Sequence, residues 1–275
     1  MRKLSLQEIK EKELDILLET DRICRRHDIS LKLVSGTLLG AVRHKGFIPW
    51  DDDIDTGLSR PDYNRFIDIC EKELPDNLRM LCYEKKTSDF PFCKIVDTRY
   101  QVEMEYLEGT GYLWIDIFPF DGLPESDREV EALYRKTAAL RKLMQTADAK
   151  ENTGKTELKR VLKRFAVPIL NIPGRRFYSD RIYREATKYN FDECIYCGGT
   201  VWGLYGSSER IGKAGFLEDA IVEFEGHSFH TMGCWDEYLS HLYGDYMTLP
   251  PENERPTHDM AVWEALYPSN SYFYN

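Results

Sequence analysis

Four aspartates fall within five positions of this chain and could act together: Asp51, Asp52, Asp53 and Asp55. Like charges this close repel one another, and the pKa of at least one carboxyl group rises unless a cation lies among them. If the segment is a strand, Asp51, Asp53 and Asp55 share one face, about 6.5–7 Å apart at the backbone, and Asp52 faces the other way. Carboxylate oxygens are the ligands that Mg²⁺ prefers. The flanking Trp50 and Ile54 argue against an inert, solvated loop, so the segment predicts a site for Mg²⁺ or Mn²⁺.

Another carboxylate, Asp116, stands inside the apolar run Trp114–Phe118. A lone aspartate in an apolar strand is costly to bury without a partner. Asp116 is therefore either a third acidic residue of the metal site or a structural residue held by hydrogen bonds. Asp121, just past Pro119, is expected in a turn.

A small-residue segment, Ser35-Gly36-Thr37, separates a β-like run from the start of a helix. Glycine lets a phosphate approach the backbone, and the free amides of a helix N-terminus favour anions. Arg43, His44 and Lys45 follow two turns later and could neutralise phosphates, with arginine best suited to bidentate contacts. The alternative for this basic triplet, most of all for Lys45, is a solvated helix end.

The elements that must position these residues follow from the apolar periodicity and the turn residues. Helices are predicted over 5–28 and 61–74, a hairpin or strand pair over 47–58, and strands over 31–35, 78–83, 92–97, 100–106 and 112–118, with Pro119, Gly122 and Pro124 ending the sheet. Residues 126–190 carry 16 Lys and Arg against 8 Asp and Glu and read as two or three helices. Short strands and a helix near 236–243 follow. We therefore expect a catalytic core over 1–125, a basic helical segment over 126–190, and a part over 191–275 that packs on the core and completes the site.

Composition excludes several functional classes. The 275 residues carry 37 Lys and Arg against 47 Asp and Glu, a net charge of −10, which disfavours nucleic-acid binding because phosphate neutralisation needs excess positive charge. Met1–Leu18 lacks the apolar centre of a signal peptide, and no run approaches the roughly 18 apolar residues of a membrane span. These features predict a cytoplasmic protein.

The seven cysteines are an odd number and scattered along the chain, which is typical of reduced thiols. One pair, Cys194 and Cys197, has the spacing of metal ligands, and His227, His230 and Cys234 could complete a zinc site. The alternative is that all are ordinary buried or surface thiols.

Three segments together resemble a known family. A phosphate cradle, an aspartate pair and a third aspartate on a neighbouring strand form the pattern of the nucleotidyltransferase fold, which is related to DNA polymerase beta. Ser35–Leu58, Trp114–Pro124 and Tyr243–Pro251 narrow the match: they resemble the LicD family, which includes bacterial phosphocholine transferases and is related to the fukutin-type phosphoalditol transferases. The resemblance implies an α+β fold, with a mixed sheet flanked by helices, a helical insertion and a C-terminal α/β extension.

The resemblance also implies an activity: Mg-dependent transfer of a phosphorylated small alcohol from a CDP-linked donor, in many members CDP-choline, to a hydroxyl of a cell-surface glycan such as teichoic acid or lipopolysaccharide. Asp53 and Asp55 match the metal-binding pair, Asp51 is a candidate third ligand, and Asp116 matches the third acidic position. Asp53, Asp55 and Asp116 are then the catalytic residues, and Ser35, Gly36, Thr37, Arg43 and His44 the donor phosphate site.

Two other activities use a similar site. A nucleotidyltransferase would add a nucleotide from a nucleoside triphosphate to a small molecule, and another transferase would carry a different phospho-alditol. A degenerate copy that serves only as a binding subunit would be expected to lose one of the four acidic residues, which are intact here.

A quaternary ammonium is recognised by aromatic faces backed by a carboxylate. Aromatic candidates in the C-terminal half are Trp202, Tyr205, Trp235, Tyr238, Tyr243 and Tyr246. Predicted substrate contacts are Trp50, Glu225, Tyr243 and Asp245, with a turn cap as the alternative for Glu225. The choice of choline rests on the family resemblance alone.

A basic amphipathic helix is predicted over 156–170, where Leu158, Val161, Leu162 and Phe165 share one face, flanked by Lys159, Arg160, Lys163 and Arg164. Such a helix can lie in a membrane interface, which would bring the protein to the inner face of the membrane and to a lipid-linked acceptor. The alternative is an ordinary helix packed on the core, and Pro168 favours a short one.

Overall fold

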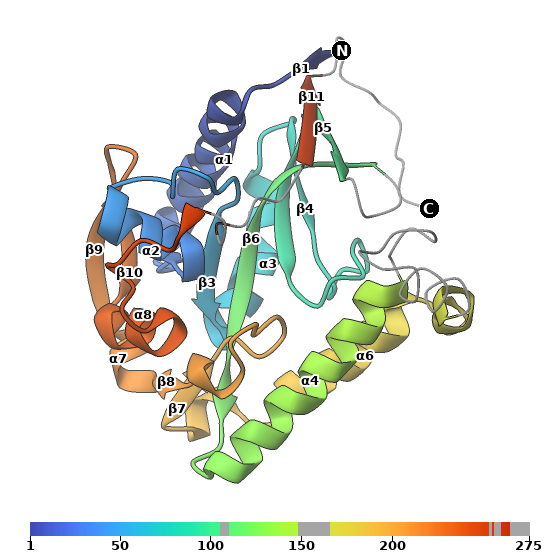
Figure 1. The fold of residues 1–275 in the computed structure, drawn as a ribbon, viewed down its shortest axis with the longest axis vertical. Coiled ribbons are helices and arrows are strands. Elements are labelled where there is room, and N and C mark those ends of the chain that lie inside the picture. The colour runs from blue at the N-terminus through green and yellow to red at the C-terminus, as the bar shows by residue number, and fades with distance from the viewer. Residues whose placement is uncertain (105–109, 148–165, 253–254, 256–259, 265–275) are drawn as a thin grey trace.

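The structure, a computed structural model, describes residues 1–104, 110–147, 166–252, 255 and 260–264. Its centre is a mixed sheet of 11 strands among these residues. In Figure 1 the sheet runs from β9 on the left to β5 and β11 on the right. The strand order is β1 (Arg2–Lys3), β11 (Met260–Glu264), β5 (Cys93–Met104), β6 (Thr110–Leu123), β3 (Asp55–Ser59), β2 (Lys32–Leu33), β10 (His227–Met232) and β9 (Asp219–Phe224). β4 (Leu78–Leu81) pairs with β5, and β7 (Tyr196–Gly198) pairs with the end of β6 and with β8 (Ile211–Gly212). The sheet flanked by helices confirms the predicted α+β class.

Two long helices cover one face of the sheet. α1 (Leu6–Arg26) starts at a capping box in which Ser5 and Glu8 satisfy each other's backbone amides. α3 (Arg60–Glu73) starts at Ser59, whose hydroxyl accepts from the Asp62 amide. Both helices contact each other and β6, and they bury large apolar side chains such as Ile16, Leu17 and Phe66. The predicted helices over 5–28 and 61–74 are confirmed.

The described part of the basic segment is helical, as expected. α4 (Asp127–Ala147) and α6 (Arg175–Ala186) pack side by side (Figure 1) and bury Val130, Leu133, Tyr178 and Ile182 in clusters separate from the main core. Residues 166–171 are also helical. Most of the predicted amphipathic helix, including Lys159, Arg160, Lys163 and Arg164, lies outside the described residues. Within the described ranges, no helix combines the length and apolar character needed to cross a bilayer.

The C-terminal part adds strands to the sheet at several places. β10 lies parallel to β2, β11 pairs with β5, and β7 extends the pairing at the far end of β6. Two helices belong to the same part of the chain: α7 (Lys213–Leu217) follows β8, and α8 (Trp235–Tyr243) follows β10. Chain segments remote in sequence therefore meet at the middle of the sheet, where β2, β3 and β6 lie next to one another.

The predicted end of the sheet at Pro119 is wrong, because β6 continues to Leu123. Pairing with β5 stops at Ile117 and pairing with β7 starts at Asp121, so Pro119 is bonded only to β3, opposite Leu58. A proline lacks the amide that a two-sided ladder needs, and here one side of the strand is open at that position. The predicted strands 92–97 and 100–106 are likewise one strand, β5, with a register shift between Asp97 and Gln101.

The predicted turn position of Asp121 is also wrong. Its side chain is buried within β6 and accepts two hydrogen bonds from the Arg60 guanidinium, at 2.6 and 3.0 Å, and one from the Thr200 hydroxyl at 2.9 Å. A buried carboxylate is tolerable when it is paired in this way. The pair ties α3 to the segment that follows β7.

Candidate active site

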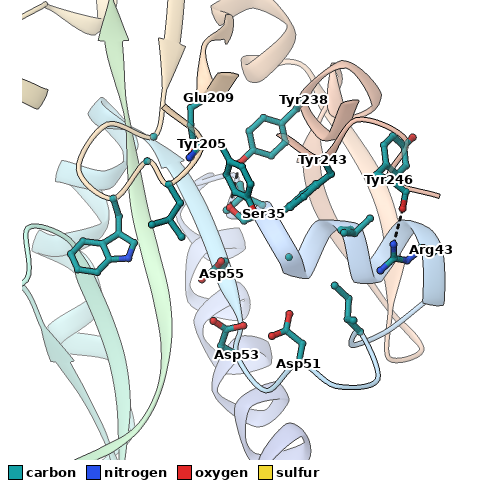
Figure 2. Close-up of a pocket in the computed structure, with 18 of the residues that line it drawn as sticks. Ser35, Arg43, Asp51, Asp53, Asp55, Tyr205, Glu209, Tyr238, Tyr243 and Tyr246 are labelled. Atoms are coloured by element: carbon teal, nitrogen blue, oxygen red, sulfur yellow. Dashed lines mark hydrogen bonds between the residues drawn. The ribbon is translucent and has the colours of Figure 1, made fainter. Parts of the chain in front are cut away.

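A cavity of about 860 Å³ opens between the start of α2 (Ser35–His44), the loop before β3, residues 199–205, and the segment from α8 to Pro251. Figure 2 shows Asp51 and Asp53 on one side of this cavity, with the rings of Tyr205, Tyr238 and Tyr243 on the other. The cavity thus has an acidic side and an aromatic side. Segments that are far apart in the sequence build it together.

The acidic segment is not the strand that the sequence predicted. Residues 51–54 form a loop, and only Asp55 belongs to a strand, as the first residue of β3. Local hydrogen bonds hold the loop, because the Asp51 amide donates to the Ile48 carbonyl at 3.0 Å and the Asp55 amide donates to the Thr37 hydroxyl at 2.8 Å. Asp51, Asp53 and Asp55 nevertheless line the cavity, and Asp52 is buried away from it.

Negative charge is concentrated at the floor of the cavity. Burial raises the pKa of Asp55 well above its usual range, and the neighbouring charges of Asp53, Asp116 and Asp51 raise it further, opposed by Lys94. A divalent cation would relieve this repulsion, so the donor set fits a metal. The described residues contain no group of three or more His, Cys, Asp or Glu side chains arranged to hold one. Mg²⁺ commonly takes only one or two carboxylates, and substrate phosphates and water complete its coordination.

Asp116 lies directly opposite Asp55 in the parallel pairing of β3 and β6. Its carboxylate accepts a hydrogen bond from the Lys94 ammonium at 2.7 Å, and the Lys94 ammonium in turn lies 4.3 Å from the centre of the Trp114 ring. Asp116 does not line the cavity. It stands beside the aspartate pair with an ionic partner of its own, as the structural interpretation expects, and its role at a metal stays a prediction.

The start of α2 faces the acidic loop. Ser35 and Gly36 line the cavity, and a Cβ at Gly36 would lie 3.1 Å from an oxygen of Asp51, so a side chain there would crowd the carboxylate. Ser35 has a left-handed backbone, with φ of 49°. Thr37, predicted in the phosphate site, is buried and turns its hydroxyl to Asp55 rather than to the cavity.

Of the basic triplet, only Arg43 lines the cavity. Its guanidinium donates to the Tyr246 carbonyl at 2.7 Å, as drawn in Figure 2, and to the His44 ring at 3.0 Å. Burial, together with the charges of Arg43 and Lys10, lowers the pKa of His44, which suits a neutral ring that accepts from Arg43. His44 therefore orients Arg43, and Lys45 ends the helix in a left-handed conformation.

The predicted substrate contacts divide into two groups. Trp50, Tyr243 and Asp245 line the cavity. Glu225 does not, because its carboxylate accepts from the Phe47 amide at 3.0 Å and its backbone forms a left-handed turn. The turn-cap alternative for Glu225 is thus the one that the structure bears out.

Four of the other aromatic candidates also line the cavity: Trp202, Tyr205, Tyr238 and Tyr246. Trp235 does not. The zinc site considered for Cys194 and Cys197 does not form, because among the described residues neither belongs to a group of three or more His, Cys, Asp or Glu side chains that could hold a metal. All seven cysteines are free.

Three charged residues near the site escaped the sequence analysis. Lys10 of α1 donates to the carbonyls of Ile48 and Pro49, both at 3.1 Å, and so supports the acidic loop from behind. Glu13 is buried one turn later, where burial and the loop aspartates raise its pKa well above its usual range. Lys94 becomes a partner of Asp116 only through strand pairing. No local sequence pattern marks any of the three.

A fourth missed residue, Glu209, lines the cavity although only 6% of it is exposed. It ends a short 3₁₀ helix, Gly206–Glu209, and its carboxylate accepts from the Tyr205 amide at 3.3 Å. Burial raises the pKa of Glu209 to about 7, against the opposing effects of the Tyr205 amide and the Arg141 charge. A buried carboxylate on the aromatic side of the cavity is unexpected from the sequence.

Comparison with known proteins agrees with this geometry. A family model described as LicD/FKTN/FKRP, nucleotidyltransferase domain, matches residues 28–143, the range that holds α2, the acidic loop and Asp116. The chain is 33% identical over 267 residues, 94% of its own length and 97% of the relative's, to the lipopolysaccharide cholinephosphotransferase LicD of Haemophilus influenzae. Shorter matches join it to uncharacterized proteins of Rickettsia typhi, 43% identical over 54 residues, and Rickettsia prowazekii, 45% identical over 47 residues.

Proposed function

The chain belongs to the LicD family, and from that premise we propose that it transfers phosphocholine from CDP-choline to a hydroxyl of a cell-surface glycan, with Mg²⁺ or Mn²⁺ as the metal. The relative that supports this is a lipopolysaccharide cholinephosphotransferase matched along nearly its whole length. The observation that carries the proposal is the cavity itself: an aspartate pair and a helix N-terminus on one side, and aromatic rings on the other. A phosphorylated alcohol with a cationic end fits such a cavity.

The metal would be held by Asp53 and Asp55, and when bound it neutralises the donor pyrophosphate and stabilises the leaving CMP. Ser35 and Gly36 offer backbone amides to the phosphates at the start of α2. Arg43 adds a guanidinium whose orientation is fixed by the Tyr246 carbonyl and the His44 ring.

In the transfer, the acceptor oxygen forms a bond to the phosphorus of the phosphocholine group, and the bond from that phosphorus to the CMP oxygen breaks. The acceptor proton goes to a carboxylate. Asp51 is the better placed for this step, because it lines the cavity and Asp116 does not. Asp116, held by Lys94 and opposite Asp55, positions the aspartate pair from behind.

The test is product analysis of the purified protein with Mg²⁺ and a glycan acceptor. CDP-choline should yield CMP and a phosphocholine-bearing glycan, and removal of the metal by EDTA should stop the reaction. Asp53→Asn should be inactive, and Asp76→Asn, at an exposed aspartate remote from the cavity, should keep wild-type activity. Release of pyrophosphate from a nucleoside triphosphate, without CMP from any CDP-linked donor, would instead identify a nucleotidyltransferase.

We also infer a peripheral membrane contact at the inner face, where a lipid-linked acceptor would be met. Ile169 and Ile172 are 65% and 81% exposed, and Phe177 is exposed with the Arg181 guanidinium over its ring, while Arg175 lies nearby in the chain. Apolar side chains flanked by arginines suit an anionic lipid surface. Flotation with anionic vesicles that fades with salt and falls in Ile172→Ser would support this contact, and no flotation at low salt would contradict it.

A further inference from the structure

The aromatic side of the cavity is a compact group of three tyrosines. The rings of Tyr205 and Tyr243 meet edge to face, with centres 5.1 Å apart and an interplanar angle of 76°. Tyr238 is fully buried beside them and packs on Phe120, with ring centres 6.2 Å apart. Figure 2 shows the three rings grouped above Ser35. Their π faces are negative, which suits a cation rather than an anion.

Glu209 adds a carboxylate to the same side. Its carboxylate is almost completely buried, and it is anchored by the backbone amide of Tyr205, a member of the group. Gly199 leaves it room, since a Cβ there would lie 3.2 Å from an oxygen of Glu209. The positive charge of Arg141 already acts on Glu209, and a second positive charge would lower the cost of the buried, ionised carboxylate further.

The acidic and aromatic sides meet at the first two residues of α2. The Ser35 hydroxyl lies 3.4 Å from the Tyr238 hydroxyl, and Gly36 lies against Asp51. A phosphate at the start of α2 therefore has the metal pair on one side and the tyrosines on the other.

We propose that Tyr205, Tyr238 and Tyr243, together with Glu209, form the subsite that binds the trimethylammonium group of the donor. The proposal rests on the proposed phosphocholine transfer and names the residues that select the alcohol. Aromatic faces and a carboxylate held at a distance attract a charge that cannot donate hydrogen bonds. The other group that could stack on these rings is the cytosine of the donor, whose amino group could donate to Glu209, so the experiment must separate binding of the base from binding of the ammonium.

The experiment compares CDP-choline with its uncharged isostere, CDP-3,3-dimethylbutanol, in which a tert-butyl group replaces trimethylammonium. Dissociation constants are measured by calorimetry without acceptor, and kcat/KM by CMP release with acceptor. The wild type should prefer CDP-choline by about tenfold or more, the order expected of a desolvated cation on aromatic faces. Binding of CMP alone measures the contribution of the base.

In Glu209→Gln the preference should fall several-fold but stay above one, because the tyrosine faces remain, while the isostere is bound and turned over as in the wild type. That unchanged value distinguishes lost recognition of charge from a folding defect. Tyr205→Leu should weaken CDP-choline by about tenfold and leave CMP unaffected. Glu193→Gln, at an exposed glutamate outside the cavity, is the matched control and should keep the full preference.

The outcomes separate the subsite from the reaction. A preference that does not fall in Glu209→Gln, or equal losses for CMP and CDP-choline in Tyr205→Leu, would overturn the subsite and leave the transferase standing. Binding of CDP-choline with the predicted preference, but no CMP release from any donor, would overturn the reaction and support the subsite. No binding of either donor by the wild type would overturn both.

Discussion

Glu209→Gln should make the stability of the protein less dependent on pH. Burial raises the pKa of the Glu209 carboxyl from 4.5 to about 7 in the folded protein. The folded state therefore holds the proton more tightly than the unfolded chain does. Below pH 4.5 both states are protonated and the burial of Glu209 costs no ionisation energy. As the pH rises from 4.5 to about 7, the wild type loses stability, and glutamine, which does not ionise, avoids that loss.

The magnitude follows from the size of the shift. A rise of the pKa from 4.5 to about 7, at about 1.4 kcal/mol for each pH unit, corresponds to about 3 kcal/mol of lost stability well above pH 7. Between pH 5 and pH 8 the linkage relation gives a change of about 2–3 kcal/mol. The glutamine amide also changes the local hydrogen bonds, but that contribution is constant with pH. The test therefore depends on how the difference in unfolding free energy between Glu209→Gln and the wild type changes with pH, and not on its value at one pH.

Urea unfolding at pH 5, 6.5 and 8 measures this slope without ligand. The free energy of unfolding of Glu209→Gln, minus that of the wild type, should grow by about 2–3 kcal/mol across the range. Arg141→Met should extend the wild-type loss to higher pH, because the Arg141 charge opposes the rise in the pKa of Glu209. A difference that stays flat from pH 5 to pH 8 would refute the buried, proton-binding state of Glu209.

Three further substitutions test other parts of the structure. Asp55→Asn should abolish CMP release and raise the melting temperature of the metal-free protein, because it removes a buried charge repelled by its neighbours; retained turnover would contradict the metal role. Asp116→Asn should lower kcat more than it raises the KM for the donor, and an unchanged kcat with a lower melting temperature would make Asp116 purely structural. Asp121→Ala should cost about 3–5 kcal/mol in urea unfolding, because Arg60 is left buried without its partner; a loss under 1 kcal/mol would mean that the pair is dispensable.

Local sequence signals predicted the parts of the site that depend on neighbours along the chain. Ser5 and Ser59 cap the helices that the periodicity placed. The glycine at position 36 lies where the backbone must come close to an acidic oxygen. The acidic residues of the loop reach the cavity although their strand was predicted wrongly, because the turn at Ile48 and the bond from Asp55 to Thr37 hold the loop in place.

The remainder of the site depends on strand order, which the sequence does not encode locally. Lys94 meets Asp116 because β5 and β6 pair in one particular register, and Pro119 is tolerated in β6 because both neighbouring pairings leave it free on one side. A short 3₁₀ helix, Gly206–Glu209, brings Glu209 to the tyrosines, and no periodic pattern in the sequence predicts that helix. Each of these contacts depends on which distant segments of the chain pack together, and no short stretch of the sequence contains that information.

In the proposed subsite, the burial of Glu209 would let one carboxylate select among CDP-linked donors. A neutral alditol placed among the tyrosines would leave Glu209 either ionised with the charge of Arg141 alone or protonated at a cost that grows with pH. A quaternary ammonium lowers that cost by supplying a second positive charge, and it needs no hydrogen bonds, which the tyrosine faces do not give. The discrimination thus comes from what the wrong donor leaves unpaired as much as from what the right donor gains. The acidic loop would follow the same principle, because its carboxylates repel one another and the proposed metal is also a cation.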